Sequence, residues 1–294
     1  MERVNDRKAW DNISKMYSKL IIPNRPSLGD IENYGRIMSL VLGNKKNPKI
    51  MIMGSTPELR SAAYRFRIMK GAKVFCVDIS ENMYEAMNNF CVSKQSNDEK
   101  YLERSWLKTG FKKDYFDLIL GDEVICNIPF ESQDELFKEI SRILKKNGAW
   151  VTRHNFSIGK DEVTNPKEII EYLAINISNG NINFDFAVNL LFVDFFYYAG
   201  WHNPLDNSME SHLKVMKKEY LIHFKKHPLK KIVKELIDLY DIFWVSLSGN
   251  HNWSIVSRKD SEIRLKKFFK IGKKLYSNDY PTAKNSPIYL LSKK

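Results

Sequence analysis

Short apolar runs that each end at a glycine or an acidic residue are the feature that most limits the fold of this chain. Lys49-Ile-Met-Ile-Met53 ends at Gly54, and Lys73-Val-Phe-Cys-Val77 ends at Asp78. A continuous apolar run of this length predicts a strand buried on both faces, as in a parallel sheet. The residues between the two runs, 57–70, have the pattern of a helix. The sequence therefore predicts a βαβ unit.

The same alternation continues along the chain. Further helices are predicted at 28–42, 81–90 and 133–144, further strands at 116–120 and 149–153, and an antiparallel pair at 268–275 and 287–291. Repeated βα units predict an α/β fold, a Rossmann-like doubly wound sheet with helices on both faces. We expect this sheet to be mostly parallel with an antiparallel last strand, and to carry an N-terminal helical cap and a helical insertion after the fifth strand.

The expected parts of the chain follow from this pattern. We expect an N-terminal helical cap, a Rossmann-like core that binds the ligand, a helical insertion that binds substrate, and a C-terminal part that completes the sheet; their ranges are 1–48, 49–154, 155–241 and 242–294.

Composition excludes several classes of protein. The three cysteines are far apart and no Cys/His cluster has zinc spacing, which argues against a disulfide framework or a bound metal. The first ten residues lack the apolar core of a signal peptide, and Asp185 and Asp194 interrupt the longest apolar stretch, 184–201. We therefore expect a cytoplasmic protein with no membrane partner. Most of the net charge of +12 comes from lysines in 259–294, which we interpret as a solvated surface.

Four polar or glycine positions lie at predicted strand ends: Gly54, Asp78, Asp122 and Arg153. In an open α/β sheet, ligands bind beyond the carboxyl ends of the strands, where the strand order switches. Asp78 follows the second strand, where a carboxylate can accept hydrogen bonds from both hydroxyls of a ribose. This arrangement favours a ligand that contains a nucleoside.

The sequence of the glycine turn indicates which kind of nucleoside ligand fits. A GxGxxG turn presents backbone amides to a pyrophosphate, whereas 54–59 has one glycine, a proline without an N–H at 57, and a carboxylate at Glu58 that repels phosphate. The turn therefore disfavours a dinucleotide and favours a nucleoside with a cationic or zwitterionic arm.

With these motifs the chain resembles the class I S-adenosylmethionine-dependent methyltransferases. The resemblance rests on the first strand with its glycine turn, the ribose-binding motif, the fourth-strand motif, and the turn and strand that follow, which are residues 50–59, 77–80, 116–122 and 144–153. A Gly-x-Thr-Pro-Glu-Leu glycine motif with Arg25-Pro26-Ser27 upstream is similar to a bacterial subset of that family. In that subset an acidic residue often precedes the tryptophan that follows the third strand. In this chain the tryptophan is Trp106, and the residue before it is Ser105.

The resemblance implies a cofactor site for S-adenosylmethionine, with S-adenosylhomocysteine as the product. It implies that Gly54 and Ser55 line the methionine arm, that Asp78 holds the ribose, and that Ile79 and Trp106 contact adenine. The remaining residues that it implies for cofactor binding are Tyr17, Arg25, Thr56, Met83, Gly121 and Asp122.

The chemistry of the acceptor decides whether a base is needed. A neutral amine or a thiolate needs none, whereas a hydroxyl usually loses its proton to one. Asp122 and His154 are the candidate catalytic residues because both follow predicted strands, and His202 and His251 remain open as further bases. The aromatic residues of the insertion favour a small, partly apolar acceptor that is methylated on an O or N atom.

Two other functions remain open. Asn127-Ile-Pro-Phe130 resembles the Asn-x-Pro-aromatic motif of ribosomal-RNA adenine dimethyltransferases, in which the aromatic ring stacks on a flipped base. However, that motif should end the fourth strand, and here it lies five residues beyond Asp122. A protein that binds S-adenosylmethionine without catalysis is the third hypothesis. The sequence does not define the oligomeric state.

Overall fold

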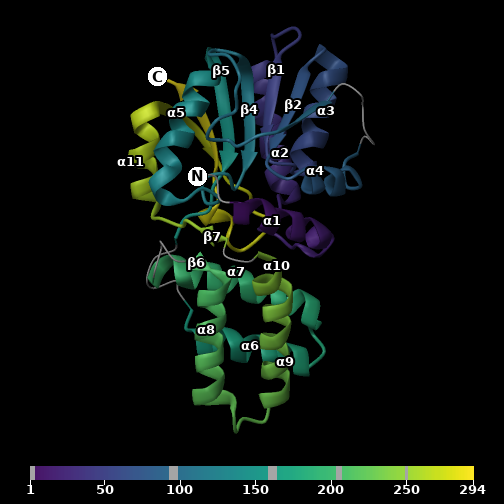
Figure 1. The fold of residues 1–294 in the computed structure, drawn as a ribbon, viewed down its shortest axis with the longest axis vertical. Coiled ribbons are helices and arrows are strands. Elements are labelled where there is room, and N and C mark those ends of the chain that lie inside the picture. The colour runs from purple at the N-terminus through teal and green to yellow at the C-terminus, as the bar shows by residue number, and fades with distance from the viewer. Residues whose placement is uncertain (1–3, 93–98, 158–163, 203–206, 249–250) are drawn as a thin grey trace. The chain divides into compact units, whose positions relative to one another are not determined.

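The computed structural model describes residues 4–92, 99–157, 164–202, 207–248 and 251–294 (Figure 1). The chain divides into two compact units. We call Arg25–Phe156 with Ser257–Lys294 the sheet unit, and Met1–Asn24 with Ser157–Val256 the helical unit. Each unit is therefore built from two separate parts of the sequence.

The sheet unit contains a seven-stranded sheet with the order β3-β2-β1-β4-β5-β9-β8. Its strands are β1 (Lys49–Met53), β2 (Lys73–Asp78), β3 (Glu99–Glu103), β4 (Phe116–Asp122), β5 (Leu144–Arg153), β8 (Phe269–Leu275) and β9 (Ile288–Lys293). The first five are parallel, and β9 runs antiparallel to both β5 and β8. This confirms the predicted α/β fold, a Rossmann-like sheet with one antiparallel strand near its end.

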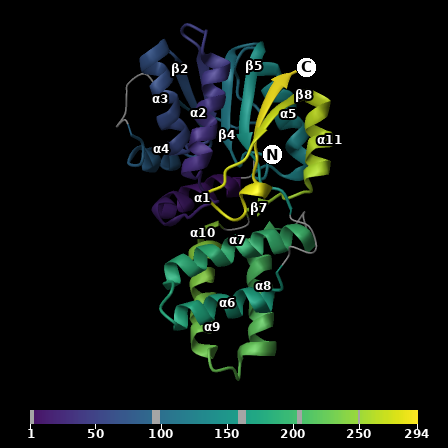
Figure 2. The same cartoon turned by 180° about the vertical axis from the view of Figure 1, so that it is seen from behind.

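Helices cover both faces of this sheet (Figures 1 and 2). The helices of the unit are α2 (Leu28–Leu42), α3 (Pro57–Lys70), α4 (Glu81–Asn88), α5 (Gln133–Ile143) and α11 (Arg258–Phe268). Alternate residues of β1 face opposite sides: Ile50 and Ile52 pack with residues of α2 and α3, whereas Met51 and Met53 pack with residues of α5 and α11. Because both faces are buried, the strand is apolar throughout rather than alternating.

Local signals fix the ends of two of these helices. Ser27 and Asp30 form a capping box at the start of α2, in which each side chain accepts from the other's backbone N–H. Pro57 occupies the first turn of α3, where its missing N–H costs nothing, and Gly71 ends the helix in the left-handed conformation. Helix α3 thereby starts directly after the glycine turn that follows β1.

The seven-stranded sheet contains one strand that the sequence pattern did not predict. β3 has the sequence Glu-Lys-Tyr-Leu-Glu and lies at the edge of the sheet, where its residues are half-buried or exposed. Edge strands are commonly charged because charge discourages pairing with another chain, so their sequences lack a continuous apolar run.

The helical unit contains α1 (Val4–Ile13), a 3-10 helix (Ser14–Lys19), α6 (Pro166–Ser178), α7 (Phe184–His202), α8 (Met209–Glu219), α9 (Lys230–Tyr240) and α10 (Ser246–Ser248). A π-helix follows α8 at Tyr220–Phe224 and another follows α9 at Asp241–Val245. β6 (Asn207–Ser208) and β7 (Asn252–Trp253) form a short antiparallel pair.

The aromatic residues of α7 form the core of the helical unit. Phe192 stacks on Trp244 with ring centroids 4.0 Å apart, and Phe195 and Phe196 are buried. These rings therefore stabilise the packing of the unit. Among the helices that the structure describes, none combines the length and the apolar composition that a membrane crossing requires.

Candidate active site

The strand order switches between β1 and β4, since the chain adds β2 and β3 on one side of β1 and β4 on the other. Met53 of β1 is in register with Val77 of β2 on one side and with Gly121 of β4 on the other. Gly54, Asp78 and Asp122 each lie at or just beyond the carboxyl end of one of these strands. The structure therefore brings them to one edge of the sheet, where ligands of such folds bind.

Gly54 turns the chain from β1 into α3 with a φ of +86°, a value that favours glycine. Its N–H donates to the Val77 carbonyl at 2.9 Å, and the Trp106 Nε1–H donates to the same oxygen at 2.7 Å. A Cβ at position 54 would lie 3.4 Å from the Trp106 ring. The indole therefore lies directly against the glycine turn, as a cover for the ends of β1 and β2.

Asp78 is buried and oriented by its neighbours. The Ser55 hydroxyl donates to Asp78 Oδ2 at 2.7 Å, and the Ser80 backbone N–H donates to Oδ1 at 3.1 Å. These two hydrogen bonds fix the orientation of the carboxylate at the end of β2. Ile79, the next residue, is only half-buried, and Met83 is buried in the first turn of α4.

Glu58, in the first turn of α3, is neutralised by Arg25. The Arg25 Nε and Nη2 groups donate to Glu58 Oε1 at 3.0 and 2.6 Å. Thr56 is the residue before α3, and its side chain makes no capping hydrogen bond. Arg25, predicted as a cofactor contact, thus lies beside the glycine turn with its guanidinium on a carboxylate.

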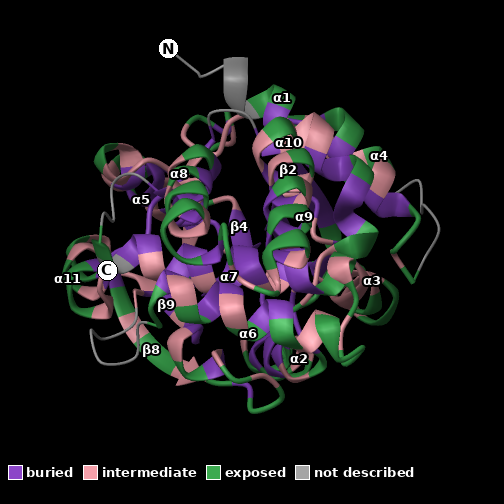
Figure 3. Cartoon of the chain, turned by 90° about the horizontal axis from the view of Figure 1, so that it is seen from below, coloured by how far each residue is buried: buried purple, intermediate pink, exposed green. Residues whose placement is uncertain are grey.

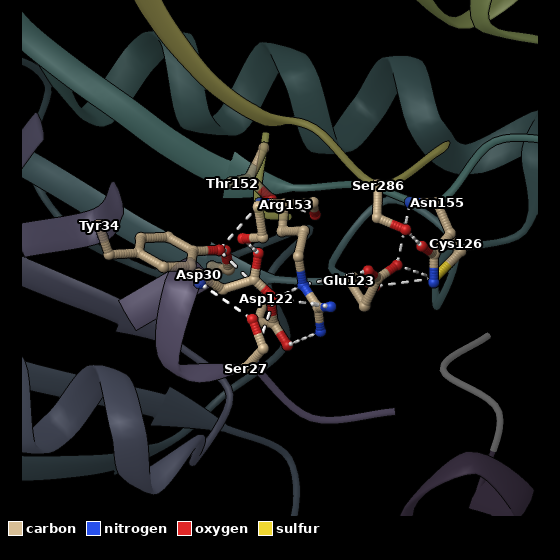
Figure 4. A network of polar contacts seen from close by, with 12 residues as sticks. Ser27, Asp30, Tyr34, Asp122, Glu123, Cys126, Thr152, Arg153, Asn155 and Ser286 are labelled. Carbon is tan, nitrogen blue, oxygen red and sulfur yellow. Dashed lines mark hydrogen bonds and ion pairs between the residues drawn. The ribbon is translucent and has the colours of Figure 1, made fainter. Parts of the chain in front are cut away.

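Arg153 organises the ends of β4 and β5 (Figure 4). It is fully buried, and its Nε and Nη2 groups donate to the two oxygens of Asp122 at 2.7 and 2.9 Å. Its Nη1 lies 3.2 Å from Asp30 Oδ2. Burial alone lowers the pKa of Arg153, but the surrounding carboxylates raise it well above its ordinary value. The guanidinium therefore stays charged.

Tyr34 links α2 to the same strand ends. Its hydroxyl donates to the Gly121 carbonyl at 2.6 Å and accepts from the Arg153 N–H at 2.9 Å. Burial raises the pKa of Tyr34 well above its ordinary value, so the hydroxyl keeps its proton. Gly121 and Asp122 are thus held in place from both sides.

The two predicted catalytic residues both have structural partners. Both oxygens of Asp122 accept from Arg153, as described above. His154 is fully buried, its Nε2 lies 3.1 Å from the Ser261 hydroxyl, and burial lowers its pKa to about 3. The other ring nitrogen of His154, Nδ1, is buried and has no hydrogen-bond partner among the described residues.

Glu123 follows Asp122 and was not among the residues singled out in the sequence. Its φ of +54° is unusual for a residue with a side chain, and such strain is common at functional sites. Oε2 accepts from the Asn155 N–H at 3.1 Å, whereas the buried Oε1 accepts no hydrogen bond and lies 3.5 Å from Arg153 Nε. Burial raises the pKa of Glu123 to about 7, against the opposing effect of Arg153.

Asn127 lies one turn further along. Its Nδ2 group donates to the Glu123 carbonyl at 2.7 Å, which leaves the buried Oδ1 without a donor. Two hydrogen-bond acceptors without donors therefore occur within five residues at the carboxyl end of β4. Because a buried acceptor without a donor costs free energy, such atoms are candidates for contact with a ligand.

The remaining candidates lie elsewhere. Tyr17, His202 and His251 belong to the helical unit, where Tyr17 and His251 are buried. Of the lysines in the C-terminal region, Lys266 and Lys274 pair with Glu262, and Lys267 lies 4.0 Å from Asp134. Within the described residues, no group of three His, Cys, Asp or Glu side chains could hold a metal ion.

Comparison with protein families identifies part of the sheet unit. Residues 55–152 match a family described as a methyltransferase domain. This region contains Asp78, the end of β4 and most of β5. The chain therefore contains a region that matches a methyltransferase domain, and this match supports an enzyme with S-adenosylmethionine as its cofactor. A comparison with curated proteins gives no match.

Solved structures share the fold at low sequence identity. A protein from Rhodobacter sphaeroides described as a Zn-dependent alcohol dehydrogenase is 15% identical with a TM-score of 0.57, over 100% of both chains. The N-methyltransferase NodS from Bradyrhizobium japonicum WM9, solved with S-adenosylhomocysteine, is 7% identical with a TM-score of 0.50, over 98% of this chain and 99% of that one. Magnesium protoporphyrin IX methyltransferase from Synechocystis PCC 6803, also with S-adenosylhomocysteine, is 11% identical with a TM-score of 0.50, over 98% and 95%.

Proposed function

We propose that this enzyme transfers a methyl group to an O or N atom of a small molecule, with its cofactor held at the ends of β1 and β2. The observation that carries the acceptor side is the pair of buried acceptors, Glu123 Oε1 and Asn127 Oδ1, beside the switch point. The two oxygens together can accept both hydrogens of an amine, and either one can accept the single hydrogen of a hydroxyl.

The residues at the strand ends fit the cofactor. Asp78 offers carboxylate oxygens to the ribose hydroxyls, and the half-buried Ile79 and Trp106 offer apolar surface to adenine. Gly54 and Ser55 form the turn beside which the methionine arm lies in this proposal. Because Arg25 neutralises Glu58, the turn carries no excess negative charge. The motif 54–59 is thereby proposed as the glycine motif of the domain.

Glu123 is proposed as the residue that takes the acceptor's proton. When bound, S-adenosylmethionine supplies an electrophilic methyl group on a sulfonium. With an amine acceptor, Asn127 Oδ1 accepts a hydrogen bond from one N–H, and Glu123 Oε1 takes the proton of the other as the new bond to carbon forms. With a hydroxyl acceptor, the single O–H proton goes to Glu123 Oε1. With a pKa of about 7, Glu123 is a stronger base than an ordinary carboxylate and is still partly ionised at neutral pH. Asp122 and Arg153 then act by positioning the turn.

Binding of S-adenosylhomocysteine tests the cofactor site. Asp78→Asn removes the charge that accepts the ribose hydroxyls, and we expect calorimetry to show roughly a tenfold or greater loss of affinity. Asp114→Asn is the matched control, because Asp114 is an exposed residue whose partner is Lys293. Equal affinities for the Asp78→Asn and Asp114→Asn variants would remove Asp78 from the site.

Glu123→Gln tests the proton acceptor. Mass spectrometry of small-molecule extracts incubated with labelled S-adenosylmethionine identifies an acceptor by its gain of one methyl group. With this acceptor, we expect the wild-type rate to rise with pH through about 7 and then level, because only ionised Glu123 accepts a proton. In Glu123→Gln the rate falls roughly 100-fold or more, while S-adenosylhomocysteine still binds. If Glu123→Gln keeps the wild-type rate and pH profile, Glu123 is not the residue that takes the proton.

A further inference from the structure

The turn that joins α8 to α9 carries a dense positive charge. Residues 214–231 contain seven lysines and one acidic residue, Glu219. All seven lysines are exposed. Figure 1 shows the two helices joined by this turn at one end of the helical unit, and Figure 3 shows exposed residues along both helices. We call residues 214–231 the lysine tip.

Carboxylates neutralise little of this charge. Glu219 faces His223 at 3.5 Å, and Lys217 pairs with Asp241 at 3.2 Å. Within the part of the chain that the structure describes, the other six lysines have no carboxylate within ion-pair distance; they are Lys214, Lys218, Lys225, Lys226, Lys230 and Lys231. The lysine tip therefore keeps a net positive field that an anionic surface would neutralise.

Apolar side chains protrude among these lysines. Leu221 and Ile222, on the π-helix that follows α8, are 63% and 59% exposed. Phe224, on the same π-helix, is buried and anchors the turn to the core of the unit. Two aliphatic residues exposed to water beside unpaired lysines are the pattern of a surface that inserts shallowly into a lipid headgroup layer.

We infer that the lysine tip binds the surface of a membrane that contains anionic phospholipids. Lysines attract the headgroup phosphates, and Leu221 and Ile222 leave water at the boundary with the acyl chains. Nucleic acid fits this surface less well, because the lysine tip has no arginine for bidentate phosphate contacts. Phe224 is buried and thus not available for stacking on bases. Such peripheral binding needs no membrane-crossing segment and is independent of the methyl-transfer chemistry.

Vesicle co-sedimentation of the full chain tests this inference. We expect the protein to sediment with vesicles of phosphatidylcholine mixed with phosphatidylglycerol, but not with phosphatidylcholine alone, and added salt to reverse the binding. Lys225→Gln with Lys226→Gln should lower the partition coefficient roughly tenfold or more. Leu221→Ser with Ile222→Ser should also lower it, while circular dichroism stays unchanged, since all four side chains are exposed.

Matched controls come from the sheet unit. Lys112→Gln with Lys113→Gln removes an exposed lysine pair, and Ile68→Ser with Met69→Ser removes exposed apolar residues of α3. Both should bind vesicles as the wild type does. The inference is overturned if the wild type does not bind anionic vesicles at low salt, or if both tip variants bind as the wild type does. It is also overturned if the tip variants lose affinity for an RNA oligonucleotide but keep it for vesicles.

Discussion

At the scale of single residues, the buried ion pairs of Arg153 should make a large contribution to the stability of the sheet unit. Arg153→Ala leaves Asp30 and Asp122 buried without their cation, and removing one partner of a buried pair typically costs about 3–5 kcal/mol. We expect urea denaturation to show a loss of this size. Arg36→Ala is the control, because Arg36 and Glu32 are about 70% exposed, so that this substitution should cost less than about 1 kcal/mol. Similar losses for the two variants would contradict the account.

Residues also differ in how well their positions follow from the sequence. Asp78 could be placed at the carboxyl edge of the sheet because a carboxylate after a short apolar run marks a strand end. Glu123 could not be predicted in this way. Its candidate role rests on a backbone conformation and on an oxygen that accepts no hydrogen bond, and neither feature has a periodic signal in the sequence. The one available signal was a second acidic residue directly after Asp122.

At the scale of elements, Gly→Ala substitutions at two positions should change stability in opposite directions, because one glycine lies within a helix and the other in a turn. Gly35 lies within α2, and a Cβ there meets nothing within 4 Å, so Gly35→Ala should stabilise the fold by about 0.5–1 kcal/mol. Gly54→Ala places a side chain at a φ of +86° against Trp106 and should destabilise by about 1–2 kcal/mol. Thermal unfolding measures both. Shifts of the same sign would show that the turn tolerates a side chain.

Elements with strong local signals lie where the sequence predicted them. The first strand, α2 and α3 have the expected bounds because apolar runs, a serine cap, a proline and a glycine mark their ends. β3 was not predicted because an edge strand does not need an apolar run. The lysine tip was also not predicted, because the acidic residues elsewhere in 151–258 balance its charge in a regional sum.

At the scale of the whole molecule, each unit contains a buried histidine and an acidic residue whose pKa is raised. In the helical unit, burial lowers the pKa of His212 to about 3 and raises that of Asp194 to about 6. In the sheet unit, His154 and Glu123 are shifted in the same two directions. The two carboxyl groups with raised pKa values contribute less to the free energy of unfolding as the pH rises from about 4.5 to 7. The two histidines contribute less as the pH falls, so the two effects oppose each other near pH 5–6.

A substitution of His212 measures the loss of stability that a buried histidine causes at acidic pH. Its ring nitrogens lie 2.8 Å from the Tyr240 hydroxyl and 2.5 Å from Asn207 Oδ1. Below pH 6.5 the unfolded chain binds a proton that the folded unit excludes, so His212 lowers stability by about 2 kcal/mol between pH 6.5 and 5. His212→Gln loses hydrogen bonds at every pH but should lack this pH-dependent loss, whereas the exposed His202→Gln should keep it. Urea unfolding at both pH values gives the difference, and parallel pH dependence in wild type and His212→Gln would mean that His212 is protonated in the folded protein.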